Sequence, residues 1–208
     1  MVHKSIVNTI SFQKGRNNME TTALKKLSFE KKYNLAKEFK TPTEILEILA
    51  SDAEWKVRKA VAYNISTPLN VLTKLATDND WEVRFNVADN KSTPTELLAI
   101  LAKDKQRWVR CAVARNENTL PKDLTMLAKD DFWDIRIEVA KNKHISSEAI
   151  AILVTDCEVS VRFYVAQNPN IPLKALETLT NDTDDAVRSI ASKVLKKRMI
   201  KNEQIMAR

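Results

Sequence analysis

Apolar residues return along this chain with a period of 26 residues, in two alternating stripes. In the first stripe a leucine follows another leucine or an isoleucine by three residues, which puts both side chains on one face of an α-helix. In the second stripe a Val-Arg pair precedes a Val-Ala pair, as in the segment VRKAVA at residues 57–62. Each period therefore predicts two short helices, the first of about ten residues and the second over about residues 54–63 in the first copy.

Three recurring polar positions predict where these helices begin and end. Thr-Pro at 41/42, 67/68 and 93/94, with Glu44 and Glu96 three residues after the threonine, is typical of a capping box with proline in the first helical position. An aspartate before the second stripe, such as Asp52, is expected to be the N-cap of the second helix. An asparagine after it, such as Asn64, is expected to close that helix, because asparagine tolerates the left-handed conformation.

A helix pair this short cannot bury its apolar stripe alone, so neighbouring copies are expected to stack on one continuous core. The predicted fold class is all-α, a solenoid of about six two-helix repeats closed by helical caps. Residues 1–18 are interpreted as a leader, either disordered or an artefact of start-site choice. A single repeat domain is expected over residues 19–208, with an N-terminal capping repeat (19–40), six repeats (41–66, 67–92, 93–118, 119–144, 145–170 and 171–196) and an extension of the last helix (197–208).

One aspartate and one arginine recur six residues apart in every copy. On a helical wheel the arginine lies in the recurring arc that faces neighbouring repeats, where a buried guanidinium needs a partner. We therefore expect an Asp–Arg ladder between adjacent repeats, the alternative being a phosphate track lined by the arginines. The ladder residues are Asp52, Arg58, Asp78, Arg84, Asp104, Arg110, Asp130, Arg136, Asp156, Arg162, Asp182 and Arg188.

Tryptophan precedes the ladder arginine by three residues at Trp55, Trp81 and Trp133. This spacing places the ring on the same side of the helix as the arginine, so that the two can stack. We expect these tryptophans to pack between repeats. The alternative is a platform on which nucleic-acid bases stack.

The pattern P..LL..LA.D....VR..VA.N, which these residues form over about 41–196, resembles the variant leucine-rich repeat, a relative of HEAT repeats. The resemblance implies an all-helical solenoid of short helix pairs, without the β-strands of ordinary leucine-rich repeats. It implies little about function, because such repeats serve many partners. Some family members carry a cysteine-rich iron–sulfur segment before the repeats. The first cysteine here is Cys111, so that cofactor is not expected.

The opposite arc of the second helix varies between copies, and we expect it to face solvent and to hold the residues that select a partner. Trp108 is the sharpest candidate, because Arg107 occupies the usual tryptophan position and the aromatic residue has moved one place outward. The alternative is that the position shared by Phe85, Cys111, Ile137 and Phe163 only widens the core. The candidate partner-binding residues are Phe85, Trp108, Cys111, Arg115, Phe163 and Tyr164.

Positive charge is concentrated at the two ends of the chain. The formal net charge of +7 divides into +6 for residues 1–40, −2 for residues 41–170 and +3 for residues 171–208. A groove that follows nucleic acid needs basic residues along its length. We therefore predict a non-catalytic scaffold that binds a protein or peptide segment on its inner surface. Nucleic-acid binding, through the basic end segments or an arginine-lined groove, is the alternative.

Catalysis and cofactor binding have little support in the sequence. His3 and His144 lack a recurring nucleophile or carboxylate pair beside them, and Cys111 and Cys157 lack further ligands at metal-binding spacing. We predict no enzyme, no cofactor and no metal, with a HEAT-like enzyme of the DNA glycosylase type as a distant alternative. No apolar run approaches the roughly 18 residues of a membrane span, and we expect a cytoplasmic protein with reduced thiols.

Overall fold

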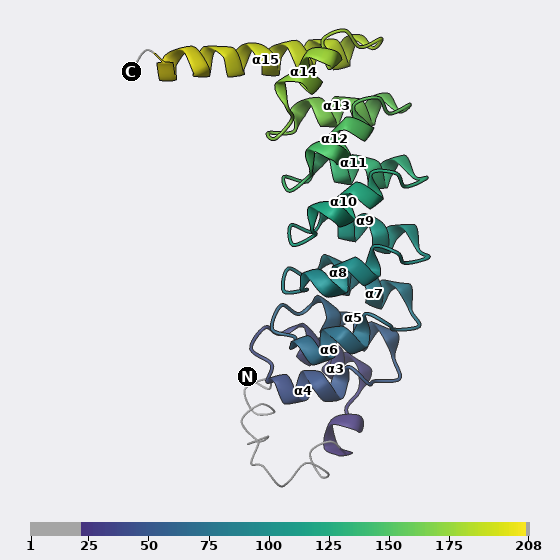
Figure 1. Cartoon of the computed structure of the whole chain (residues 1–208). Helices are drawn as coiled ribbons and strands as arrows, with labels where there is room; N and C mark the ends of the chain where they lie inside the picture. Colours follow the sequence, from purple (N-terminus) through teal and green to yellow (C-terminus); the bar gives the residue numbers. More distant parts are fainter. Residues whose placement is uncertain (1–21, 207–208) are drawn as a thin grey trace. The chain divides into compact units, whose positions relative to one another are not determined.

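A computed structural model describes residues 22–206, so the predicted leader at residues 1–18 lies outside the described residues. Over the described range the chain forms α-helices and turns and no β-strand (Figure 1), which confirms the predicted all-α repeat fold. The first helices of the repeats are α4 (Thr43–Leu49), α6 (Leu69–Leu75), α8 (Thr95–Leu101), α10 (Pro121–Leu127), α12 (Ser147–Leu153) and α14 (Leu173–Leu179). The second helices are α5 (Trp55–Tyr63), α7 (Trp81–Asp89), α9 (Arg107–Arg115), α11 (Trp133–Lys141), α13 (Val159–Gln167) and α15 (Asp185–Met206). A helix in the place of a second helix, α3 (Phe29–Lys37), precedes the first repeat.

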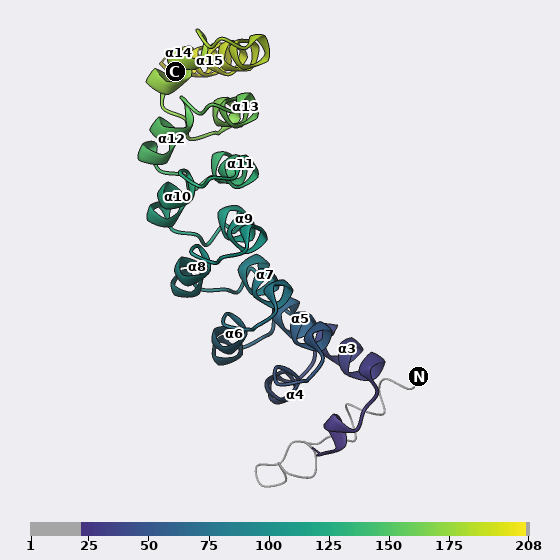
Figure 2. The same ribbon diagram turned by 90° about the vertical axis from the view of Figure 1, so that its right-hand side faces the viewer.

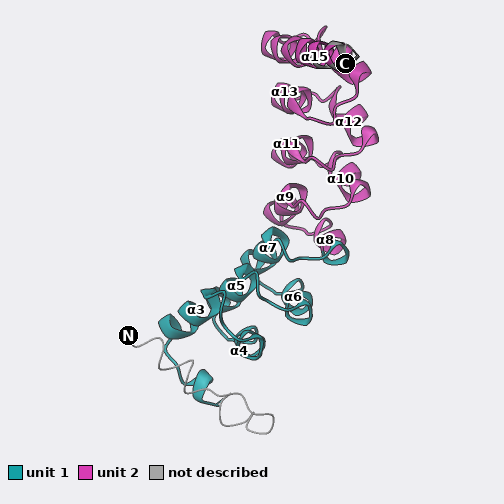
Figure 3. Cartoon of the chain, turned by 90° about the vertical axis from the view of Figure 1, so that its left-hand side faces the viewer, with its two compact units in different colours: residues 1–97 teal, residues 98–208 magenta. Residues whose placement is uncertain are grey.

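The chain divides into two compact units, one up to residue 97 and one from residue 98 onward (Figure 3). The division falls within α8. Inside each unit the first helices form one layer and the second helices another (Figure 2). The second helices pack directly on one another, α3 on α5 and α5 on α7 in the first unit, and α9 through α15 in succession in the second unit. The extent of a single domain over residues 19–208 stays a prediction.

An alanine recurs as the next-to-last residue of the second helices from α5 to α13. Ala62, Ala88, Ala114, Ala140 and Ala166 are fully buried. In α15 the same position is Ser192, which is exposed, and the position of the buried Ile137 is the exposed Ser189. These two positions of α15 are therefore polar and exposed.

The predicted capping box at the start of the first helices is wrong. Helix α4 begins after Pro42, which is its N-cap, and no side chain caps it. The Thr41 hydroxyl instead donates to the carbonyl of Leu35, 2.6 Å away and six residues earlier. Thr67, Thr93 and Thr119 make the same bond to Val61, Val87 and Val113. The threonine thus forms a hydrogen bond to the end of the preceding second helix. In α4 the proline, and not the threonine, is the N-cap.

The ladder aspartate does not cap the second helix as predicted. The N-cap of α5 is Glu54, two residues after Asp52, and Asp52 Oδ1 accepts the Glu54 N–H at 3.0 Å. Asp130 and Phe132, the N-cap of α11, repeat this turn at 3.1 Å. An aspartate that bonds the backbone two residues ahead forms an Asx turn. Its second oxygen remains available to another group.

The asparagine after each second helix is not left-handed, contrary to the prediction. Asn142 has φ −66° and ψ 128°, an extended conformation. Its side chain is buried, and its amide donates to the carbonyls of Ala114 and Asn116 in the preceding repeat at 2.8 and 3.1 Å. Its Oδ1 accepts the His144 N–H at 2.9 Å. Asparagine is required here because one side chain must both donate and accept.

Candidate partner-binding surface

The ladder arginines pair with the aspartate of the following repeat. Arg136 Nε lies 2.6 Å and Nη2 2.9 Å from the two oxygens of Asp156, a bidentate pair whose side chains are only 11% and 6% exposed. Nη1 donates to the Asp130 carbonyl at 2.8 Å, so the same guanidinium also holds its own repeat. Equivalent pairs join Arg58 to Asp78, Arg110 to Asp130 and Arg162 to Asp182.

The ladder changes at its two ends. In α3 a lysine replaces the arginine, and Lys32 lies 2.8 Å from Asp52. Arg188 contacts Asp185 on its own helix and donates to the Asp182 carbonyl at 2.6 Å. Arg84 is buried and donates to the Asp78 carbonyl at 2.7 Å. Side chains engaged in this way are bound within the fold, which occupies donors that a phosphate track would need.

The ladder lowers the pKa of two of its carboxyls in unit 2. The hydrogen bond from Arg162 lowers the pKa of Asp182 below its usual value. Burial would raise the pKa of Asp156, but the hydrogen bonds from Arg136 and from the Glu158 N–H lower it further than burial raises it. Carboxylates stabilised in this way contribute to folding at neutral pH.

The second-helix surface of unit 2 is the side of α9, α11 and α13 that carries Trp108, Cys111, Arg115, Phe163 and Tyr164. On α9, Trp108, Cys111 and Arg115 follow at steps of three and four residues and so form one stripe. Trp108 is 43% exposed and Arg115 is exposed. Burial, reinforced by the carboxylates of Glu138 and Asp134, raises the pKa of the Cys111 thiol to about 11, so this cysteine is a neutral thiol and a poor nucleophile.

Helix α11 links this stripe to the aromatic residues of α13. Lys141 Nζ lies 4.4 Å from the centre of the Tyr164 ring and 2.9 Å from Glu138 Oε1. Phe163 and Tyr164 meet edge to face, with ring centres 5.7 Å apart, and both are half-buried. The surface therefore combines aromatic rings with charged side chains that are held in place by their neighbours.

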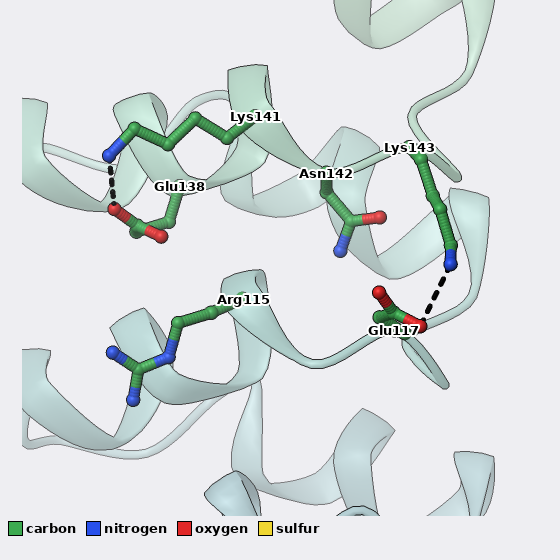
Figure 4. A pocket seen from close by; sticks show the side chains of 6 residues that line it. All are labelled: Arg115, Glu117, Glu138, Lys141, Asn142 and Lys143. Atoms are coloured by element: carbon green, nitrogen blue, oxygen red, sulfur yellow. Dashed lines mark hydrogen bonds and ion pairs between the residues drawn. The ribbon is translucent and has the colours of Figure 1, made fainter.

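A hollow of about 170 Å³ opens at the carboxyl ends of α9 and α11 (Figure 4). Arg115 and Glu138 extend to the same side of it, and Lys143 reaches across to Glu117 at 2.8 Å. Asn142, also in its wall, is one of the buried asparagines that join repeats. Both signs of charge line the hollow, which suits a peptide carrying several polar groups better than a single ion.

The predicted division of the second helix into two arcs is wrong in part. Ala60, Asn86 and Ala112 belong to the arc expected to face solvent, and all three are buried. In these three copies the position belongs to the core, whereas in α13 it holds the half-buried Tyr164. Ile137 is 6% exposed, so at that residue the position does extend the core. Phe85, in unit 1, is half-buried and lies edge-on to Trp81 at 6.5 Å.

The tryptophan position is also more exposed than predicted. Trp81 is 37% exposed and Trp133 is 52% exposed, so neither is a packed interface residue. Trp55 is half-buried, and the ammonium groups of Lys56 and Lys59 lie 5.7 and 5.6 Å from its ring. The three rings are thus partly or largely exposed at the starts of α5, α7 and α11.

In unit 2 the structure brings together a cluster of side chains that the sequence pattern did not link. The Arg107 guanidinium carbon lies 4.3 Å from the Trp108 ring centre and 5.1 Å from that of Phe132. Its Nε is 4.0 Å from Asp134 Oδ2, longer than a hydrogen bond. The sequence does mark Phe132 as unusual, because the other repeats carry acidic residues or glutamine at its position.

Neither a metal site nor a membrane span is found within the described residues. A search of these residues finds no group of three or more histidine, cysteine, aspartate or glutamate side chains able to hold a metal ion. Their helices are all too short or too polar to cross a bilayer.

Comparison with solved structures places the repeat among known folds. A structure described as a leucine-rich repeat variant with a novel repetitive protein structural motif aligns with 84% of this chain and 70% of its own, with a TM-score of 0.66 and 27% sequence identity. The YibA protein of Escherichia coli aligns with 89% of this chain and 98% of its own, with a TM-score of 0.49 and 17% identity. No protein-family model matches the sequence, and no curated protein matches it.

Proposed function

We propose that this chain, which has the helical repeat fold of the leucine-rich repeat variants, is a non-catalytic scaffold. Its second-helix surface in unit 2 binds a protein segment. The observation that carries the proposal is Trp108, a large aromatic side chain left 43% exposed on that surface. Tryptophan, tyrosine and arginine contribute most of the energy at protein interfaces. Trp108 has Arg115 on its own helix, and α13 adds Tyr164.

The architecture supports an extended partner. Successive second helices pack side by side, so equivalent positions on α9, α11 and α13 stand in a row at the roughly 8 to 10 Å separation of packed helices. An extended peptide rises about 3.3 Å per residue, so about three of its residues would span each step. Trp108 and Tyr164 are two steps apart and would contact different parts of one segment.

Substitution of Trp108 tests this proposal. A random peptide library displayed on phage and selected on the whole chain supplies ligands, whose affinity is then measured by calorimetry. We expect Trp108→Ala to weaken binding by about 2 kcal/mol, because it removes an exposed anchor, and to change the free energy of unfolding little. Met126→Ala is the matched control, since Met126 is 38% exposed but lies in the first-helix layer. Equal affinities for both variants would refute the assigned surface.

Nucleic-acid binding through the ends is the second candidate, favoured by exposed lysines at Lys25, Lys26, Lys31, Lys196 and Lys197. Lys32 and Arg198 belong to the same basic segments but are engaged within the fold. Fluorescence anisotropy with a labelled DNA oligonucleotide at several salt concentrations tests it. Replacement of the five exposed lysines by glutamine should abolish a weak, salt-sensitive affinity. Binding that survives both replacement and high salt would assign nucleic acid to another surface.

A further inference from the structure

Two departures from the repeat pattern meet in unit 2. The residue just before α11 is Phe132. The residues at the same position before the other second helices are Glu54, Asp80, Gln106, Glu158 and Asp184. The first residue of α9 is Arg107, where three other repeats have tryptophan. Repeats pack well with the usual residues, so neither change is needed for folding. That the two changed residues touch indicates a site with a use of its own.

The contact is a stack of a cation on two rings. The guanidinium of Arg107 lies 4.3 Å from the centre of Trp108 and 5.1 Å from the centre of Phe132. The guanidinium carbon of Arg110, from the ladder, also lies 5.8 Å from the centre of the Phe132 ring and helps to hold that ring. Trp108 is 43% and Phe132 is 40% exposed, so the stack is at the surface.

Stacking leaves the donors of Arg107 directed outward. A guanidinium carries its N–H groups in its plane, so rings packed near its faces leave the edges open to an acceptor. The Arg107 side chain is 40% exposed, and its ion pair with Asp134 is long at 4.0 Å. The Asp134 carboxylate thus attracts the guanidinium without a hydrogen bond of ordinary length.

Resting on the proposed function, we propose that Arg107, held between Trp108 and Phe132, receives a carboxylate side chain of the bound protein segment, and that an apolar residue beside that acid packs on the exposed rings. Arginine binds carboxylate with two parallel hydrogen bonds. The rings restrict the guanidinium before binding, so less conformational entropy is lost when the acid arrives. The inferred partner is a segment with one aspartate or glutamate next to an apolar residue.

Local charge favours a single carboxylate over a nucleic acid. Asp131 is exposed beside Phe132, and Asp134 and Glu138 follow on α11. These acids would repel a phosphate chain, which needs basic residues along its path. A peptide places one negative charge at Arg107 and apolar atoms against the rings, and so avoids most of this repulsion.

Variants that restore the repeat pattern separate binding from folding. Phe132→Glu and Arg107→Trp introduce the residues that other repeats carry at these positions, so thermal unfolding should stay near that of the unchanged chain. Arg107→Lys keeps the charge but loses the planar pair of donors. For peptides selected from the displayed library we expect all three to weaken binding about tenfold or more. Lys174→Gln, which changes an exposed cation on α14, should have no effect.

Asp134→Asn should strengthen peptide binding, whereas the three variants above should weaken it. It removes the charge that competes with the incoming carboxylate, so acidic peptides should bind about threefold more tightly. A glutamine version of each selected peptide should bind about tenfold more weakly and should lose its response to Asp134→Asn.

The possible results distinguish this inference from the proposed function. Selected peptides that contain the acid and respond to Arg107 and Asp134 as described support it. Peptides that need Trp108 but ignore Arg107→Lys overturn the inference and leave the scaffold surface standing. Failure to select any peptide overturns both. A single-stranded DNA oligonucleotide that binds more tightly than the peptides and is lost with Arg107→Trp would assign the site to nucleic acid instead.

Discussion

Two regions of the molecule obey the 26-residue period to different degrees. The interior columns, formed by the ladder aspartate, the ladder arginine and the buried asparagine, recur because each residue bonds both its own repeat and a neighbour. The more exposed columns, at the positions of Gln106, Arg107 and Trp108 and their equivalents, vary between copies. A residue that satisfies two repeats at once tolerates little change, whereas a residue bordered by solvent can acquire a binding role at little cost in stability.

Acid should produce the largest effect, because it acts on many interior pairs together. The folded-state pKa values of Asp78, Asp156 and Asp182 are lowered. Their contribution to stability is therefore complete above the unfolded-state pKa of about 3.9 and is lost as the pH falls through the lower folded-state values. Urea unfolding should show a steep loss of the free energy of unfolding below about pH 4.

Arg162→Gln serves as the control for acid unfolding. Asp182 then lacks its guanidinium partner, so the variant is less stable at neutral pH but loses less on acidification than the unchanged chain. A free energy of unfolding that is the same at pH values of about 6 and 2.5 would show that the ladder carboxylates contribute nothing.

Breaking one interior pair should have the next largest effect. Arg136→Ala leaves the Asp156 carboxylate, only 6% exposed, without its bidentate partner, and we expect a loss of about 3 kcal/mol in the free energy of unfolding. Arg188→Ala removes a partly exposed arginine that pairs with the exposed Asp185 on its own helix, and should cost less than 1 kcal/mol, roughly the value of a surface pair. Similar losses for the two variants in denaturant titrations would contradict the distinction between interior and terminal arginines.

Removal of one buried asparagine should destabilise somewhat less. Asn142→Ala takes two donors from the carbonyls of Ala114 and Asn116 and one acceptor from the His144 N–H, and we expect a loss of about 2 kcal/mol. Asn142→Asp keeps the shape and the acceptor but removes the donors, so it should be at least as damaging. If Asn142→Asp is neutral in thermal unfolding, the amide donors are unimportant.

The smallest effect is expected at the C-terminal end, where Val194 stands at the asparagine position and Arg198 bonds the preceding loop instead. Arg198 Nη2 donates to the Pro169 carbonyl at 2.6 Å and the guanidinium also bonds Ile171, so α15 is tied to the preceding loop. Arg198→Ala should cost about 1 kcal/mol and speed amide hydrogen exchange in α15. Lys197→Ala changes an exposed neighbour and should leave exchange as it was. Equal exchange rates in both variants would show that Arg198 does not hold the helix.

Much of the repeat follows directly from the sequence. The spacing of Leu46 and Leu49 and of Val57 and Val61 predicts buried helix faces, and all four residues are 2% exposed or less. Local pattern suffices here because an amphipathic helix presents the same face wherever it packs. The first helix nevertheless has seven residues, Thr43–Leu49, fewer than the ten expected, because the chain turns immediately after the buried leucine.

Hydrogen-bond partners could not be read from local pattern. Thr41, Asp52 and Asn64 all have common capping roles in isolated helices. In the fold each bonds a group outside that expectation, such as Thr41 with the Leu35 carbonyl and Asn64 with the Ala36 carbonyl. These partners lie six and 28 residues away, and their proximity depends on how repeats stack.

The sequence by itself determined the period and the helix pairs, because these depend on side-chain spacing within about one turn. Only the tertiary structure decided which faces of the second helix are open, since a second helix has neighbours on two sides and a wheel shows neither. It also brought Arg107 and Phe132 together from adjacent repeats. Residues separated by 25 positions meet there because stacking places the starts of α9 and α11 side by side.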